Sequence, residues 1–339
     1  MLAVFDERQS LHKPLTRMAG GQLAESPEQP GRIVMLKAGL EAFGARLIEP
    51  VEHDDKAIEA IHDSDYLAFL KHGYSQWRQN PGNGPEMRAS VHPNIYMNRK
   101  PKDLLGRAGY FQADASCVLV EGTWEAVKAS ANTAVDAMAR VLAGEDRAYA
   151  LCRPPGHHAY SDKAGGFCYL NNTAIAAEFA TQRGHRVAIV DVDVHHGNGT
   201  QTIFYDRADV LTVSVHGDPA HLYPYYAGYA DETGRGPGLG FNLNLPLPLF
   251  GDSDTYAAAV LAGARAARDF SPDVLIVALG LDASSADPFA CMNVDEDGFK
   301  RIGGHLGRLC PKTLVVQEGG YPSPVLSVLL QAFLTGLTA

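Results

Sequence analysis

The sequence has few cysteines, no long apolar run and no excess of basic residues. The cysteines are odd in number and widely spaced, at Cys117, Cys152, Cys168, Cys291 and Cys310. Without a C-x-x-C pair, neither a disulfide framework nor a cysteine-rich zinc knot is expected. We therefore predict buried, reduced thiols and a cytoplasmic location.

The longest apolar stretches, such as residues 274–279, are far shorter than the ~20 residues that cross a bilayer. Charged residues within the first eight positions exclude the apolar core of a secretory signal. No membrane segment is predicted. The 29 basic against 39 acidic residues give a net charge of −10, which disfavours nucleic-acid binding because that requires a basic face. Such a charge tolerates a cationic small molecule best.

Apolar runs alternate with alanine-rich stretches, a pattern typical of βα units. The runs are apolar on both faces, as in a parallel sheet covered by helices on each side, so we predict a three-layer α/β/α fold with a mostly parallel sheet. The predicted strands span residues 2–5, 149–152, 186–192, 210–215, 274–279 and 313–316. The predicted helices span residues 123–143, 171–183, 254–269 and 325–337, with Thr123 and Asp254 as N-caps.

Residues 79–102 break this pattern, with four prolines, two glycines and no periodicity. Such a long irregular stretch inside a compact domain is usually a functional loop or a linker. Strands of the same kind lie on both sides of it, so we interpret it as an insertion. We expect one domain over residues 1–339.

The densest cluster of polar side chains, residues 191–199 (DVDVHHGNG), directly follows the apolar strand RVAIV. Open α/β sheets place their sites at such strand ends. Because side chains alternate along a strand, Asp191, Asp193 and His195 are predicted to project to one side. Oxygen and nitrogen ligands two residues apart suit a divalent metal such as zinc. A capped strand end would explain one carboxylate, but not two carboxylates and two histidines.

Three other strands end in comparable groups. Asp282 follows VLIVALG, His157 and His158 follow YALCRPPG, and Glu318 follows TLVVQ, two glycines before Tyr321. Adjacent histidines on an extended backbone point in different directions, so we expect two acid/base or electrostatic groups beside a bound water. The glycines leave Tyr321 free to aim its hydroxyl inward.

Asp193, His195 and Asp282 thus offer three metal ligands, with a fourth position left for water. This is the open arrangement of a catalytic zinc site rather than a closed structural one. A metal that acidifies water, beside a histidine base and a hydroxyl donor, predicts hydrolysis of a carbonyl compound.

Five motifs in this order resemble those of the histone deacetylase superfamily, which has the arginase-deacetylase fold. They are RPPGHH (153–158), GGFC (165–168), DVDVHHGNGT (191–200), LGLD (279–282) and EGGY (318–321). GGQL (20–23), EGTWEA (121–126), HGDP (216–219) and the proline-rich insertion are most similar to the bacterial acetylpolyamine amidohydrolases.

The resemblance implies roles for individual residues. Asp193, His195 and Asp282 would bind zinc, with ferrous iron as the alternative, and Tyr321 would polarise the acyl oxygen. His158 would act as general base and then general acid, supported by Asn198 where some relatives have an aspartate. His157 would act electrostatically, oriented by Asp191. Further roles concern a structural potassium ion at Asp191, Ser214 and the carbonyls of Asp193 and His195, and an acyl-amine tunnel lined by Gly166, Phe167 and Tyr223.

The resemblance also implies a small acylated amine as substrate and a homodimer in which the insertion narrows the entrance. Polyamine-specific relatives carry acidic residues at positions that match Leu105 and Ser116 here, with Asp103 and Asp114 as neighbouring substitutes. A protein-lysine deacetylase with the same mechanism, or a non-catalytic acyl-amine-binding protein, remains an alternative. An arginase-like dinuclear site would need more carboxylates. A dinucleotide-binding oxidoreductase is not expected, because the glycines between residues 234 and 240 do not lie between a strand and a helix.

Overall fold

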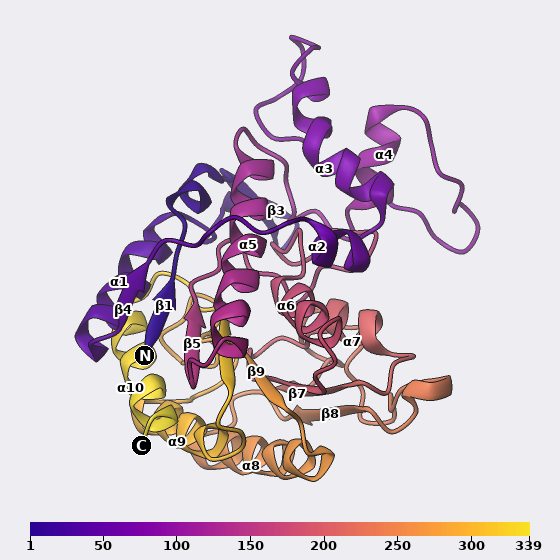
Figure 1. Ribbon diagram of the computed structural model, residues 1–339. Helices are drawn as coiled ribbons and strands as arrows, with labels where there is room; N and C mark the ends of the chain where they lie inside the picture. Colours follow the sequence, from indigo (N-terminus) through magenta and orange to yellow (C-terminus); the bar gives the residue numbers. More distant parts are fainter.

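Eight parallel strands form one continuous sheet at the centre of the protein (Figure 1). The computed structural model describes residues 1–339, and the strand order is β4-β1-β5-β10-β9-β6-β7-β8. The strands are β1 (Leu2–Val4), β4 (Arg46–Ile48), β5 (Arg147–Ala150), β6 (Val187–Asp191), β7 (Val210–Gly217), β8 (Asn242–Leu247), β9 (Val274–Leu279) and β10 (Thr313–Gln317). A separate antiparallel hairpin contains β2 (Thr16–Ala19) and β3 (Gln22–Glu25). The predicted fold class is confirmed.

Helices cover both faces of this sheet, and none is long and apolar enough to cross a membrane. One face carries α2 (Lys56–Ile61), α3 (Ser64–Trp77), α4 (Leu104–Phe111), α5 (Thr123–Leu142), α6 (Asn172–Thr181) and α7 (Asn198–Phe204). The other carries α1 (Gly31–Phe43), α8 (Ser253–Phe270), α9 (Glu296–Gly307) and α10 (Leu326–Leu337). Short 3-10 turns span Glu7–Leu11 and Gly236–Gly238. Each face has its own apolar core, so a central strand must be apolar on both sides: in β9, Ile276 packs into one core and Val277 into the other.

The predicted helix caps at Thr123 and Asp254 are wrong. The cap of α8 is Asp252, whose carboxylate accepts a hydrogen bond from the Thr255 N–H at 2.9 Å. The hydroxyl of Thr123 instead donates to the Val120 carbonyl in the preceding turn at 2.9 Å, and Gly122 precedes α5. Both helices therefore begin within one residue of their predicted starts, but the residues that cap them are Gly122 and Asp252.

Residues 79–102 connect α3 to α4 and project from the rest of the fold (Figure 1). The base of this loop is fixed, since Met87 and Leu119 exchange two backbone hydrogen bonds of 2.9 and 3.1 Å. Its outer part is apolar and exposed: Ile95 is 82% exposed, Tyr96 89% and Met97 57%. The loop thus presents apolar side chains to solvent without disturbing the core.

Candidate active site

Four neighbouring strands of the sheet, β5, β10, β9 and β6, deliver the four predicted motifs to one edge. Their order along the chain differs from their order in the sheet, because β9 and β10 lie between β5 and β6. All four are parallel, so the segments that follow them meet at the carboxyl edge, where open α/β sheets bind ligands. This topology brings residues 157, 193, 282 and 321 together.

Asp193, His195 and Asp282 form a compact group of ligand atoms, all within 4.8 Å of one another. His195 Nδ1 lies 3.2 Å from Asp193 Oδ1 and 3.2 Å from Asp282 Oδ2. Ligand atoms of a tetrahedral zinc ion lie about 3.3 Å apart, since each bond is about 2.0 Å long. The spacing and the donor set therefore fit a divalent cation.

Backbone groups hold the two carboxylates in place. The Gly319 N–H donates to Asp193 Oδ2 at 2.7 Å, and the Val194 N–H donates to Asp282 Oδ1 at 3.1 Å. A Cβ at Gly319 would lie 2.3 Å from Asp282 Oδ2, so only glycine allows this approach. Burial alone would lower the pKa of His195, but hydrogen bonds to both carboxylates raise it well above its usual value. Asp193 and Asp282 thus favour a positive charge at the position that a metal would occupy.

His157 and His158 lie side by side, with ring centroids 3.9 Å apart and a tilt of 40°. The prediction that they point in different directions is wrong, because β5 has ended at Ala150 and the backbone here forms a turn. His157 Nδ1 lies 2.9 Å from Asp191 Oδ2. Burial opposes its charge, but Asp193 and Asp191 raise the pKa of His157 to about 10, so it adds positive charge beside its neighbour.

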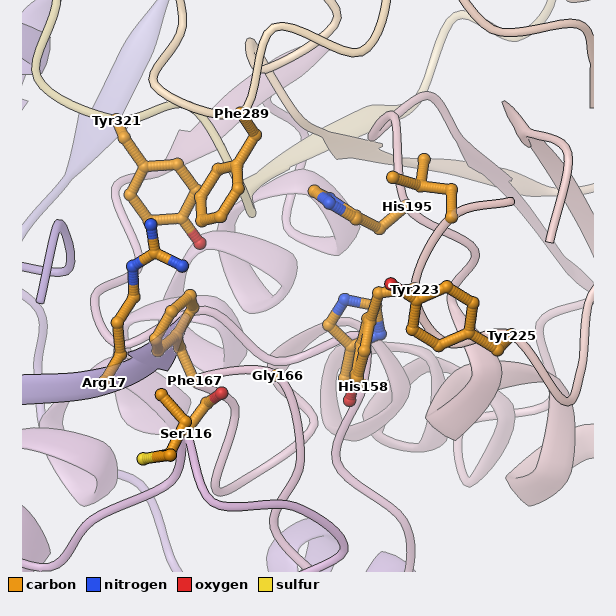
Figure 2. Close-up of a pocket in the computed structure, with 12 residues that line it drawn as sticks. Arg17, Ser116, His158, Gly166, Phe167, His195, Tyr223, Tyr225, Phe289 and Tyr321 are labelled. Atoms are coloured by element: carbon orange, nitrogen blue, oxygen red, sulfur yellow. The ribbon is translucent and has the colours of Figure 1, made fainter. Parts of the chain in front are cut away.

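His158 is the histidine that faces the cavity (Figure 2). Its Nδ1 lies 2.6 Å from Asn198 Oδ1, and the Asn198 side-chain amide donates to the Tyr160 hydroxyl at 2.5 Å. Because an amide oxygen only accepts, Nδ1 carries the proton and Nε2 keeps a free lone pair. Burial, followed by the charges of His157 and His195, lowers the pKa of His158 well below its usual value. The ring is therefore a neutral proton acceptor.

Tyr321 lies across the cavity from His158, with its hydroxyl turned inward (Figure 2). Its backbone N–H donates to Asp287 Oδ2 at 2.8 Å, and its ring packs 5.0 Å from that of Phe289. The Arg32 guanidinium lies 4.8 Å from the ring centroid. Burial raises the pKa of Tyr321 well above its usual value, so the hydroxyl stays a hydrogen-bond donor.

A cavity of about 370 Å³ lies between these side chains. It contains the predicted wall residues Gly166, Phe167 and Tyr223. Sequence reasoning missed most of the remaining lining residues, namely Arg17, Met18, Leu222, Tyr225 and Phe289. These residues lie outside the recognised motifs. Phe289 alone could have been suspected, because it follows the Asp282 motif in a Pro-Phe pair. The aromatic rings of Phe167, Tyr223, Tyr225, Phe289 and Tyr321 make up much of the wall around the metal-ligand group.

Two successive residues of this wall have left-handed backbones. Gly166 has φ +52°, and a Cβ there would lie 2.3 Å from His158 Cδ2. Phe167 has φ 68°, a conformation that costs a bulky residue on the order of 1 kcal/mol or more. In this backbone conformation the Phe167 ring packs against that of Tyr321, with ring centroids 5.8 Å apart.

Leu105 and Ser116, the two positions that the resemblance matched to acidic residues, lie in different places relative to the cavity. Ser116 lines the cavity, whereas Leu105 lies on α4 outside it and is 51% exposed. Asp103 caps α4 through the Leu105 N–H. Asp114 Oδ2 accepts from the Gly166 N–H at 2.9 Å and from the Tyr223 hydroxyl at 2.7 Å, so it supports the cavity wall. Neither aspartate is among the residues that line the cavity.

Two of the four residues predicted to hold potassium line a second, much smaller cavity. Asp191 and Ser214 are paired in the register of β6 and β7, and both face a space of about 10 Å³, room for one water-sized particle. The Asp193 carbonyl already accepts from the Tyr256 hydroxyl at 3.3 Å.

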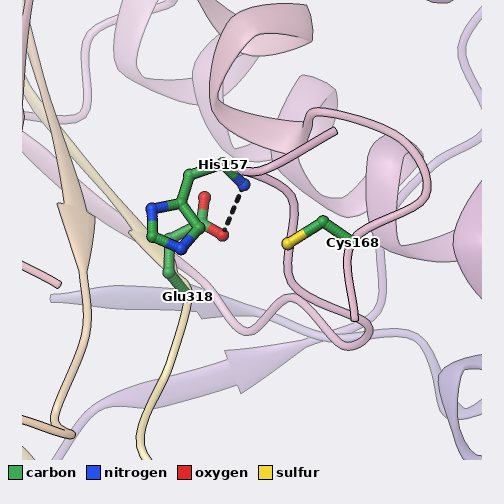
Figure 3. A group of neighbouring side chains, drawn as sticks. All are labelled: His157, Cys168 and Glu318. Carbon is green, nitrogen blue, oxygen red and sulfur yellow. Dashed lines mark hydrogen bonds between the residues drawn. The ribbon is translucent and has the colours of Figure 1, made fainter. Parts of the chain in front are cut away.

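Glu318 is buried beside His157 and Cys168 (Figure 3). Its carboxylate accepts hydrogen bonds from the N–H groups of Gly156 and His157 at 2.6 and 3.0 Å, and from the Thr173 hydroxyl at 2.7 Å. Burial raises the pKa of Glu318 to about 7. The residue therefore fixes the histidine turn to the end of β10.

A fully buried ion network lies behind Tyr321. Glu28 contacts both Arg32 and Arg153, and all three side chains are 0% exposed. Arg32 also donates to the carbonyls of Glu318 and Gly320, at 2.7 Å for Gly320. The network thus joins α1 to the loop that carries Tyr321.

Replacing Arg32 with Met is expected to lower the free energy of unfolding by about 3–5 kcal/mol, because Glu28 and two carbonyls lose their buried partner. Urea denaturation of both proteins without added metal measures this. The control is Arg301→Met, which breaks an exposed pair of the same i,i+4 spacing with Asp297 and should cost far less. Equal losses in the two variants would contradict the assigned strength of the network.

Comparisons with known proteins agree with this geometry. The histone deacetylase domain family matches residues 26–337. An acetylpolyamine amidohydrolase of Burkholderia pseudomallei (strain 1710b) is 44% identical over 100% of this chain and 99% of its own length. One from Mycoplana ramosa is 34% identical over 99% of both chains. The crystal structure of an acetylpolyamine aminohydrolase from Burkholderia pseudomallei has a TM-score of 0.94 at 43% identity, covering 100% of this chain and 99% of that one. This chain belongs to the histone deacetylase domain family.

Proposed function

We propose that this protein is a zinc-dependent amidohydrolase that removes acetyl groups from small linear amines such as acetylated polyamines. The observation that carries the proposal is the convergence of a three-ligand metal group, a neutral histidine and an inward-facing tyrosine hydroxyl on one cavity. Relatives named acetylpolyamine amidohydrolases, similar over the whole chain, support the substrate class. The five free cysteines agree with a reducing, cytoplasmic location.

Asp193, His195 and Asp282 would hold the zinc ion, with ferrous iron as the alternative. When bound, the ion supplies a Lewis acid that polarises the acyl oxygen and acidifies a water molecule. His158 Nε2 takes the proton from the attacking water and returns it to the amine nitrogen as the C–N bond breaks. His157, positively charged beside Asp191, stabilises the negative charge that develops near it. Asp191 and Ser214, with the carbonyls of Asp193 and His195, would hold a structural potassium ion; the pairing of Asp191 with Ser214 in neighbouring strands supports this.

Tyr321 donates a hydrogen bond to the acyl oxygen as negative charge accumulates there. Phe167 and Tyr223, which both line the cavity, would contact the methylene chain of the substrate. The complete set of chemical groups favours catalysis over a non-catalytic binding role.

The proposal is tested with zinc-loaded protein and a panel of acetylputrescine, acetylcadaverine, acetylspermidine, 4-acetamidobutan-1-ol and acetyl-lysine peptides. We expect the small amides to be hydrolysed to acetate and free amine with higher kcat/KM than the peptides. Faster peptide hydrolysis would instead favour the protein-lysine deacetylase. No hydrolysis of any amide would overturn the proposal.

We also propose that the chain is a single domain and that two copies form a homodimer through the loop at residues 79–102. The loop exposes Ile95, Tyr96 and Met97, which a second copy would cover. Sedimentation is expected to show a dimer for the wild type and a monomer for an Ile95→Asp, Tyr96→Asp double variant. The control is Leu239→Asp, an exposed site elsewhere that should leave the dimer intact. A monomeric wild type would refute this interface.

A further inference from the structure

One cation lines the catalytic cavity without an ionic partner. Arg17 comes from β2 and reaches toward Tyr321 and Phe289 (Figure 2). Its guanidinium carbon lies 5.1 Å from the centroid of the Phe289 ring. Its buried Nε has no hydrogen-bond partner, so the group is partly desolvated without compensation.

The nearby carboxylates are already engaged elsewhere. Glu86 accepts from the N–H groups of Leu15 and Thr16 at 2.7 and 3.2 Å and from the Thr16 hydroxyl, which anchors the start of β2. Asp114 is bonded to the cavity wall. Arg17 is therefore held on a fixed strand but is free to bind a ligand.

No acidic side chain in the cavity lining offsets this positive charge. Besides Arg17, the lining contains one serine, Ser116, and the remaining residues are aromatic, apolar or belong to the catalytic group. The net charge of −10 acts from the whole surface and is screened beyond about 8 Å at physiological salt. Arg17 is the one arginine or lysine side chain of the lining. The carboxylates just behind the wall are already hydrogen-bonded, Asp114 to Tyr223 and the Asp193 and Asp282 pair to His195.

We infer that Arg17 is a specificity residue that selects acylated amines with a carboxylate at the far end of the chain, that is, N-acyl-ω-amino acids. This rests on the amide hydrolysis of the proposed function and places the preferred substrates among acylated amines with an anionic end, ahead of acetylated polyamines. A guanidinium binds a carboxylate through two parallel hydrogen bonds, whereas a distal ammonium would meet a like charge. The reaction is the same hydrolysis: water adds to the amide carbon, the C–N bond breaks, and acetate and an ω-amino acid leave.

Three amides of similar length test the inference: 4-acetamidobutanoate, 4-acetamidobutan-1-ol and N-acetylputrescine, whose distal ends are negative, neutral and positive. With zinc-loaded wild type, kcat/KM for the carboxylate is expected to exceed that for the ammonium at least tenfold. Arg17→Gln should abolish this preference, and Arg17→Glu should reverse it. Arg268→Gln, with the same change in net charge at the far end of α8, should preserve it.

A binding measurement separates this inference from the proposed function. Calorimetric titration of the three amides into zinc-loaded Tyr321→Phe protein reports their affinities while turnover is strongly slowed. If the carboxylate binds more tightly than the other two amides, and Arg17→Gln removes this difference, the inference is supported even if no amide is hydrolysed. A preference for N-acetylputrescine that is insensitive to Arg17 variants would overturn it, although hydrolysis would still support the proposed function.

Discussion

Replacing Tyr321 with Phe is expected to lower kcat for an acetyl-amide roughly 100- to 1,000-fold, because one donor to a developing oxyanion contributes about 3 kcal/mol or more. The phenyl ring keeps its contacts with Phe289 and Arg32, so stability and zinc content should not change. Steady-state kinetics and elemental analysis of the same preparation measure both.

Tyr226→Phe is the matched control, since this tyrosine is 93% exposed and lies outside the cavity lining. It should retain wild-type kinetics. A Tyr321→Phe enzyme with kcat within a few-fold of wild type would refute the donor role, whereas a large rise in KM alone would assign Tyr321 to substrate binding.

Replacing Asp282 with Asn is expected to reduce zinc affinity at least 100-fold and to abolish turnover in metal-buffered solution, because one of three ligands becomes neutral. The effect on stability should depend on the metal. Burial, together with the neighbouring Asp193, raises the pKa of Asp282, so the ionised Asp282 carboxylate destabilises the metal-free protein at neutral pH. The variant should therefore be more stable than wild type without zinc and less stable with it.

Thermal unfolding with a chelator and with added zinc measures this reversal. In wild type, zinc at 1,000 times its Kd adds about 4 kcal/mol to the free energy of unfolding. Asp254→Asn, on the exposed surface of α8, should show the wild-type response to zinc. An Asp282→Asn protein that zinc stabilises as strongly as wild type would show that Asp282 is not a ligand.

The central strands could be predicted because both of their faces are buried, so each reads as an uninterrupted apolar run. The predicted bounds of β9 match the structure, and those of β6 differ by one residue at each end. The edge strand β8 was missed, since its sequence NLNLPL alternates and contains a proline. Helix α9 was missed because its glycines, such as Gly303, resemble a loop; a Cβ there would lie 2.1 Å from the Phe333 carbonyl of α10.

The chemical groups of the site were predictable, but its shape was not. Metal ligands, histidines and Tyr321 follow strands whose ends meet, so topology alone brings them together. Arg17 lies on a two-stranded hairpin outside the main sheet, and no periodicity connects that hairpin to the cavity. The contact between His157 and His158 depends on a turn whose dihedral angles the motif does not reveal.

The strand order also determines when the site can form during synthesis. β9 and β10 occupy the middle of the sheet, between β5 and β6, although they are made last. Until residues 313–321 have left the ribosome, β5 and β6 lack the neighbours that separate them, and the segment with Tyr321 does not yet exist. Contacts this distant in sequence form slowly. A nascent chain should therefore acquire tight zinc binding only after β9 and β10 insert, which makes metal uptake a report on completed folding.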